Sequence, residues 1–308
     1  MGLTHFPHGV SSFGMPQIGV GEETMTTGNV FFVGSAVTGA SDGNAATSPD
    51  RPMATIDAAM AKCTANNGDI IFVMPGHSED PTASIAMDVA GVWIRGLGWG
   101  SDRPTVTFGA LAATVAMSAA GCRISNIRFD LGTVAATVTN AINITAGSCI
   151  VESCETVPHA TSQFTNFLTA TDAQFVVIRN NLFRGLHTAS GTSGVVVDGC
   201  DDLVLTGNVI SGHFTEHALD NTTPASADEI LRANVSDNLI QNNSSTAGDL
   251  AVELDAAATG LFARNMLVGG LATTAANFDI GDLASMESYV SDSSGVDLYG
   301  IALGTAAV

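Results

Sequence analysis

Histidine spacing is the feature of this sequence that most directly suggests chemistry. His159, His187 and His213 are 28 and 26 residues apart, so in a chain of regular coils they would lie on one face of three successive turns. Such a column can bind a transition-metal ion through neutral imidazoles, or it can face a symmetry axis. It can equally be a stack of half-exposed histidines. We therefore name these three residues as candidate metal ligands and leave the alternatives open.

A second pattern, HxxEH, is formed by His213, Glu216 and His217. In metallopeptidases this spacing holds zinc because a helix brings both imidazoles to one face. Here the segment follows a strand-like run and a Ser-Gly turn, so a helix is not expected. The sequence predicts no zinc site at this position.

Carboxylates are the other candidates for chemistry. Asp201 and Asp202 could supply half of a hydrolytic pair or simply form an acidic turn. A column of four more aspartates could hold calcium or consist of solvated turn residues. These precede successive repeats by nine or ten residues: Asp172, Asp198, Asp228 and Asp255. No basic residue recurs beside them to act as a base, so we expect a protein that is not an enzyme and has no cofactor.

The charge balance excludes several kinds of partner. The 308 residues include 10 Lys+Arg and 30 Asp+Glu, which gives a formal net charge of −20. Lys62 is the one lysine, and the arginines are scattered from Arg51 to Arg264 without a basic cluster in the sequence. Neither nucleic acid nor an anionic membrane is expected as a partner. The five cysteines form no CxxC pair and are interpreted as buried, reduced thiols, which fits synthesis in a bacterial host cytoplasm.

A repeat of 27 to 30 residues organises most of the chain. The template is apolar-x-x-Asn-apolar-apolar, and Gly96 and Cys154 occupy the asparagine position in two of seven copies. Each period holds at least two short strands and has no room for a helix of ten residues. Such units bury their apolar faces by stacking on one another. The sequence predicts an all-β fold, a right-handed parallel β-helix of at least seven coils, with stacked amides at Asn126, Asn181, Asn208, Asn238 and Asn265.

The two ends of the coil stack need covering. Ile56, Ala59, Met60 and Cys63 lie on one helical face after Thr55, a plausible N-cap, and predict a short N-terminal capping helix. We expect four segments: an extended docking arm over 1–30, an opening strand with the capping helix over 31–90, the coils over 91–270, and a C-terminal cap or oligomer-contact segment over 271–308.

Several of these segments resemble a known superfamily. Asp42-Gly43, the run from Thr47 to Pro52, and Asn67-Gly68-Asp69 followed by 73–76 resemble the opening segment of pectate-lyase-like β-helix proteins, and 91–270 is similar to their coils. That superfamily includes phage tailspikes and other virion proteins. The first fourteen residues are similar to leaders of tailed-phage structural proteins, which implies a capsid-docking arm that includes Leu3, Phe6, Pro7, Val10 and Phe13.

The resemblance leads to two expectations about function. The first is a non-enzymatic bacteriophage virion protein, a capsid decoration or head-attached fibre on the exterior of the particle. It would be a homotrimer held by its arm to the major capsid protein or another virion protein. The alternative is a tailspike-like receptor-binding protein that binds or cleaves glycans. Glycan platforms commonly use Trp or Tyr, and Trp93 and Trp99 are interpreted as core or turn residues.

Overall fold

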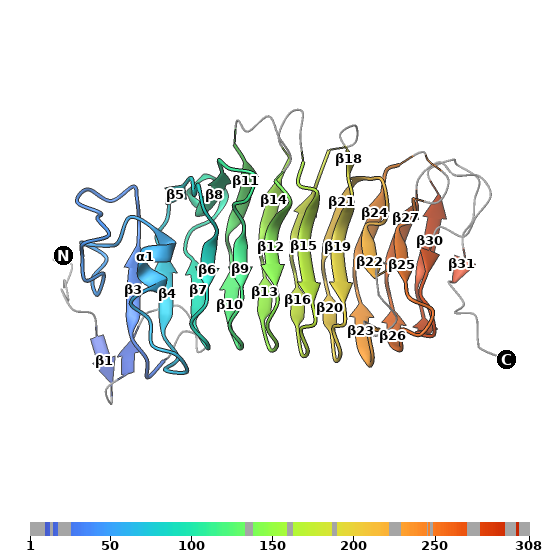
Figure 1. The fold of residues 1–308 in the computed structure, drawn as a ribbon, viewed down its shortest axis with the longest axis horizontal. Coiled ribbons are helices and arrows are strands. Elements are labelled where there is room, and N and C mark those ends of the chain that lie inside the picture. Colours follow the sequence, from blue (N-terminus) through green and yellow to red (C-terminus); the bar gives the residue numbers. More distant parts are fainter. Residues whose placement is uncertain are drawn as a thin grey trace, which may run out of the picture.

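The chain forms a parallel β-solenoid in which three strands per turn build three long sheets (Figure 1). The computed structural model describes residues 10–12, 15–17, 26–132, 138–158, 163–186, 190–221, 229–244, 246, 249–269, 278–292 and 300–301. The third sheet contains eight strands from successive turns, which corresponds to about seven turns. The predicted all-β coil architecture is therefore confirmed.

The strands follow one another along the solenoid axis in each sheet. Sheet 1 consists of β3 (Val30–Val33), β4 (Ile70–Val73), β7 (Trp93–Gly96), β10 (Arg123–Ser125), β13 (Ile150–Glu152), β16 (Val177–Arg179), β20 (Val204–Thr206), β23 (Ala233–Ser236), β26 (Gly260–Ala263) and β29 (Ala284–Met286). Sheet 2 consists of β5 (Ser78–Glu79), β8 (Thr105–Phe108), β11 (Arg128–Leu131), β14 (Glu155–Val157), β17 (Leu182–Arg184), β21 (Val209–Phe214) with β18 (Ser190–Gly191) beside it, β24 (Leu239–Asn242), β27 (Met266–Gly269), β30 (Tyr289–Asp292) and β31 (Gly300–Ile301). Sheet 3 consists of β6 (Ile85–Met87), β9 (Val115–Met117), β12 (Asn140–Ile144), β15 (Asn166–Thr171), β19 (Ser193–Asp198), β22 (Leu219–Asn221), β25 (Val252–Leu254) and β28 (Phe278–Asp279).

The core is a set of stacked apolar columns inside the coil. In the eight strands of sheet 1 from β4 to β26, one central residue pairs with its copy in the next turn, and none of these side chains is more than 1% exposed. They are Ile71, Ile94, Ile124, Val151, Ile178, Leu205, Val235 and Phe262. Because side chains alternate between the two faces of a strand, the residues on either side of this column point outward. The outer face of sheet 1 therefore presents two residues per turn.

One turn of α-helix, α1 (Ile56–Met60), lies beside the first coils and contacts β3, β4 and β6. The hydroxyl of Thr55 accepts a hydrogen bond from the amide of Ala58 at 3.3 Å, and Ile56, Ala59 and Met60 are buried. Its predicted role as a cap of the first coil stays a prediction. No helix in the described ranges is long and apolar enough to span a membrane.

The N-terminal arm is only partly described. Val10 begins β1 (Val10–Ser12), which pairs antiparallel with β2 (Met15–Gln17). The other predicted docking residues, Leu3, Phe6, Pro7 and Phe13, lie outside the described residues.

The turn from sheet 1 to sheet 2, called here the first corner, positions the site described below. One residue of this turn adopts a left-handed backbone in successive coils, with φ of 55° at Asn126, 52° at Ser153, 55° at Asn180 and 58° at Asp237. Asparagine and aspartate tolerate this conformation better than most residues. A single left-handed residue lets the chain reverse direction within two residues and enter sheet 2 in register.

Candidate functional site

Four of the five asparagines expected in the ladder stack just after the first corner. The amide Nδ2 of Asn181 donates to Oδ1 of Asn208, Asn208 donates to Asn238, and Asn238 donates to Asn265, each at 3.0 Å. These side chains are at most 2% exposed. The ladder satisfies buried polar groups inside the coil, so its role is structural.

Asn126 does not belong to this ladder. It is the left-handed residue of its turn, and its Nδ2 donates to the carbonyls of Gly96 at 2.9 Å and Gly98 at 3.0 Å. The equivalent of the ladder position in that coil is Ile127, one residue later. The expectation for Asn126 was therefore out of phase by one residue.

The histidine candidates are not brought together in the described residues. His159 and His187 lie outside them, and His213 lies in β21. His217 accepts a hydrogen bond from the amide of Leu250 at 3.2 Å and pairs with Glu253 at 2.9 Å. Within the described ranges, no group of three or more His, Cys, Asp or Glu side chains could hold a metal ion.

The aspartate candidates have partners of their own. The guanidinium of Arg232 bonds both Asp201 and Asp202, and Arg232 holds the pKa of the Asp202 carboxyl below its usual range. In the expected acidic column, Asp198 aligns with Thr171 rather than with Asp172. Asp228 lies outside the described residues. Among the described residues, Asp201 and Asp202 are thus joined to Arg232 rather than arranged as two free carboxylates.

Arginines that are far apart in the sequence lie close together at the first corner. Six of the nine, Arg95, Arg103, Arg123, Arg128, Arg179 and Arg184, lie on both sides of the first corner in four successive turns from β7 to β17. We call this set the arginine corner. The sequence shows no basic cluster, but the coil period places residues that are 27 to 30 positions apart on top of one another. The expectation that the arginines remain scattered is wrong in three dimensions.

Two glutamates on either side of Ser153 and Cys154 organise the arginine corner. On sheet 1, Glu152 pairs with Arg123 and with Arg179, the latter at 2.7 Å. On sheet 2, Glu155 pairs with Arg103 at 2.9 Å. Arg184 also pairs with Glu155, and the Nε of Arg128 lies 3.9 Å from it.

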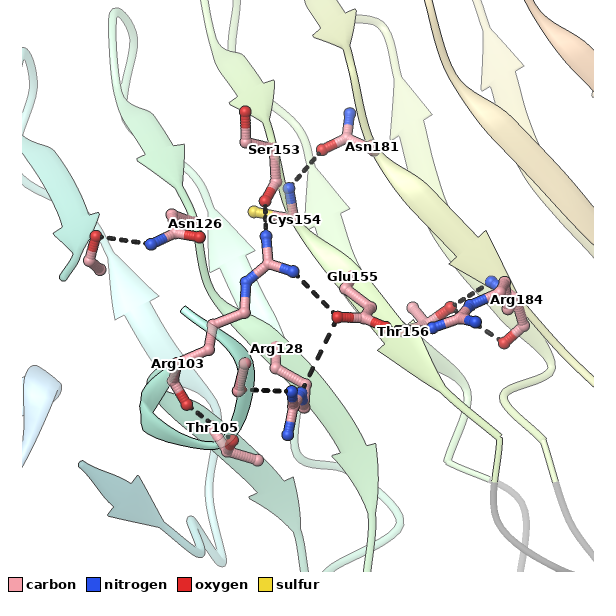
Figure 2. Close-up of polar contacts among 12 residues, drawn as sticks. Arg103, Thr105, Asn126, Arg128, Ser153, Cys154, Glu155, Thr156, Asn181 and Arg184 are labelled. Atoms are coloured by element: carbon pink, nitrogen blue, oxygen red, sulfur yellow. Dashed lines mark hydrogen bonds and ion pairs between the residues drawn. The ribbon is translucent and has the colours of Figure 1, made fainter. Parts of the chain in front are cut away.

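Arg103 reaches across two coil steps to make this contact (Figure 2). Its guanidinium donates to the backbone carbonyl of Ser153 as well as to Glu155. The side chains of Arg103 and Glu155 are each 12% exposed. Arg103 therefore ties the loop that precedes β8 to the corner beyond it.

A groove of about 510 Å³ lies on the outer face of sheet 1 beside this corner. Its lining includes Trp93, Arg95, Trp99, Glu152 and Arg179. Both tryptophans of the chain are thus in the groove. The Trp93 ring donates to the Ser125 hydroxyl at 2.9 Å, whereas the Trp99 side chain is 76% exposed. The interpretation of Trp99 as a core or turn residue is incomplete, because Trp99 is exposed to solvent and lines the groove.

Cation–π contacts fix part of this wall. The guanidinium carbons of Arg123 and Arg95 lie 4.1 Å and 5.0 Å from the centre of the Trp93 ring, and that of Arg103 lies 6.0 Å from the centre of the Trp99 ring. Aromatic faces attract guanidinium groups at these distances. The arginines are therefore held with their charge beside aromatic surface.

The backbone of the groove requires glycine at two positions. A Cβ on Gly96 would lie 2.1 Å from the carbonyl oxygen of Asn126, and Gly98 has a φ of 97°. These two glycines let the loop that carries Trp99 pass close to the next coil.

A correct phase would have revealed the arginine corner in the sequence. When the repeat is marked at Leu97 and Ile127 rather than at Gly96 and Asn126, Arg95, Ser125, Glu152 and Arg179 all fall two residues before their marks. They occupy one register column of sheet 1.

Comparison with known proteins gives distant likeness only. No protein-family model and no curated protein sequence matches the chain. One similar solved structure is a pectin methylesterase from Aspergillus niger in deglycosylated form, with a TM-score of 0.41 and 17% identity over 87% of this chain and 86% of that one. Another is a pectate lyase, with a TM-score of 0.38 and 13% identity over 87% and 80% of the two chains.

These findings correct one expectation about function. Both similar structures are enzymes, which contradicts the prediction that a chain of this kind is not an enzyme. Neither is described as a phage protein, so the predicted virion role gains no support. At these identities the likeness concerns the fold alone, and the argument on function rests on the groove.

Proposed function

We propose that the protein binds an acidic glycan in the groove on sheet 1, which makes the alternative expectation of a glycan-binding protein more specific. The observation that carries this proposal is that Arg95 and Arg179 line one groove together with the exposed Trp99, in a strongly acidic chain, while Arg123 lies against the Trp93 ring of the same groove. Tryptophan and arginine are both enriched among the residues that contribute most to binding.

The chemistry of the groove suits a sugar that carries a carboxylate or another anionic group. Arginine binds planar carboxylates through two parallel hydrogen bonds, and Glu152 between Arg123 and Arg179 shows that a carboxylate fits here. The exposed Trp99 ring offers a flat apolar surface to the C–H face of a sugar ring. The Asn180 and Ser153 polar groups at the corner can bond hydroxyls.

The overall charge argues against nucleic acid as the occupant. A chain of net charge −20 repels a long, densely charged polymer at distances beyond the groove. A short acidic segment feels the arginine corner most strongly, where six arginines outnumber Glu152 and Glu155, because salt screens the more distant acids.

Calorimetric titration with acidic and neutral oligosaccharides of one length tests the proposal. A trigalacturonate should bind with an affinity that falls as salt rises, and its neutral galactose counterpart should bind at least about tenfold more weakly. Arg179→Gln and Trp99→Ala should each reduce trigalacturonate affinity about tenfold. Arg264→Gln is the matched control, because Arg264 is a similarly exposed, ion-paired arginine outside the groove.

The same mixtures show whether the bound chain is cleaved. Unsaturated ends in the products indicate elimination, and new reducing ends indicate hydrolysis. If no acidic oligosaccharide in a panel of uronates binds, or if Arg179→Gln binds as well as the unaltered protein, the proposal is wrong.

The biological setting remains a proposal as well. A receptor-binding role on a phage exterior, a homotrimer, and attachment through the arm over 1–30 are all compatible with a glycan groove on a rigid solenoid. Deleting residues 1–30 should then abolish incorporation into particles while leaving glycan binding unchanged. Incorporation of the truncated chain at the normal level would refute the docking role of the arm.

A further inference from the structure

The groove on sheet 1 is short, and the outward side chains of sheet 1 on either side of it are uncharged. We infer that the glycan carries isolated acidic residues separated by neutral sugars, and that it lies along the outer face of sheet 1. This inference rests on the proposed function. It distinguishes such a heteropolymer from a polymer of uronic acids, in which every residue is charged.

The cationic segment covers only the turns from β7 to β16. Its register column is Arg95, Ser125, Glu152 and Arg179, three coil steps that span about 14 Å at the spacing of paired strands. A groove of this length accommodates the anionic group of very few consecutive sugars.

On the N-terminal side the outward side chains of sheet 1 are apolar and buried. Phe72 is the register partner of Arg95, and Ile70 is the partner of Trp93. Ile70, Phe72 and Trp93 form a small hydrophobic cluster separate from the main core, with Val30 and Phe32 packed against it. An anion in this direction would meet no guanidinium from the described part of sheet 1.

On the C-terminal side the same face becomes uncharged and polar. The register partner of Arg179 is Thr206, and the next is Ser236, whose hydroxyl lies 3.3 Å from that of Thr206. The other outward column continues from Val177 to Val204, both half-buried. Hydroxyls beside aliphatic side chains suit neutral sugars, which present hydroxyls and C–H groups.

The cations nearest to this uncharged face are ion-paired with aspartates, as Arg179 is with Glu152. Arg232, just before β23, bonds Asp201 and Asp202, and Arg264, just after β26, bonds Asp237 through two contacts of 2.7 Å. These acids border the face on both corners. A continuous polyanion that extended past Arg179 would run between them, in a chain of net charge −20.

Length dependence separates the two kinds of ligand. We compare galacturonate oligomers of three and six residues with hyaluronan oligomers of four and eight, in which glucuronate alternates with a neutral sugar. From the shorter to the longer oligomer, affinity should rise about tenfold for hyaluronan. For galacturonate it should rise only by the few-fold expected from additional binding registers. An equally steep rise for hexagalacturonate would overturn the inference and leave the proposed function intact.

A charge added to the neutral face provides a second, independent readout. Thr206→Lys places a cation at the register position after Arg179 and should raise hexagalacturonate affinity about tenfold without changing trigalacturonate affinity. Ser211→Lys adds the same charge in the same turn on sheet 2 and should change neither. If both variants gain equally, the effect is general electrostatics and the inference is wrong. If no oligomer binds any variant, the proposed function itself fails.

Discussion

Replacing Glu155 by glutamine removes the charge that Arg103, Arg128 and Arg184 share while keeping the size of the side chain. Arg103 would then remain almost buried, with the Ser153 carbonyl as its contact across the corner. Breaking one member of a fully buried ion pair costs about 3–5 kcal/mol. Because Arg103 and Glu155 are each 12% exposed, we expect a loss near the lower limit, about 3 kcal/mol of unfolding free energy.

The comparison variant is Arg184→Gln, which removes a partner that is 49% exposed. Exposed ion pairs contribute about 0–1 kcal/mol, so this variant should lose less than about 1 kcal/mol. Urea unfolding at pH 7, followed by circular dichroism, measures both changes, and the denaturant slope should stay the same. If the two variants unfold within about 0.5 kcal/mol of each other, the reasoning that Arg103 depends on Glu155 is refuted.

Three further results are expected. Asn208→Ala loses the hydrogen bonds of Asn208 to Asn238, to Asn181 and to the Ile178 carbonyl, and should lower the unfolding free energy by about 3 kcal/mol. The control is Asn234→Ala, an exposed residue of sheet 1, which should change the unfolding free energy by less than about 0.5 kcal/mol. Burial raises the pKa of the Cys154 and Cys200 thiols to about 12, so a thiol reagent at pH 8 should label them only after unfolding, as peptide mapping would show. Burial alone would raise the pKa of Asp69, but hydrogen bonds from the amides of Thr64 and Asn29 outweigh it and hold that pKa below its usual range. The stabilisation by the Asp69 carboxylate is therefore complete above about pH 4, and it is lost as the pH falls through the folded-state pKa of Asp69. The difference in unfolding free energy between the unaltered chain and Asp69→Asn should therefore shrink below about pH 4.

Each of these expectations has a contrary outcome. Equal stability of Asn208→Ala and Asn234→Ala would show that the amide ladder does not hold the corner. Rapid labelling of Cys154 in the folded protein would contradict its burial. A stability difference for Asp69→Asn that is constant from pH 7 to pH 3 would mean that the carboxylate charge is not what the surrounding amides stabilise.

The coil could be predicted from the sequence because its signal is repeated. Seven repeat marks recur at intervals of 27 to 30 residues, each beside apolar residues. From Asn181 onward, the asparagines of the ladder stand at these marks. The groove could not be predicted in the same way. Its arginines come from different turns, and none of them recurs in every repeat.

One error of phase also concealed the groove. Asparagine fits both the left-handed position and the buried ladder position of the first corner, so residue type alone did not distinguish Asn126 from Ile127. A shift of one residue moves side chains to the opposite face of a strand. The same error of one residue applies to the mark at Gly96: Arg95 falls one residue before it, whereas Glu152 and Arg179 fall two before theirs, so the column that the three form is not visible.

The first corner is closed by two kinds of contact along its length. Ion pairs close it around Glu152 and Glu155, and the amide ladder closes it from Asn181 to Asn265. Between turns, this corner is thus held mainly by ion pairs in one half of the molecule, and by the amide ladder together with the Arg264–Asp237 pair in the other. Because salt screens exposed pairs more than buried ones, concentrated salt weakens the Arg264–Asp237 contact first and leaves the Arg103–Glu155 contact, whose side chains are each 12% exposed, largely in place.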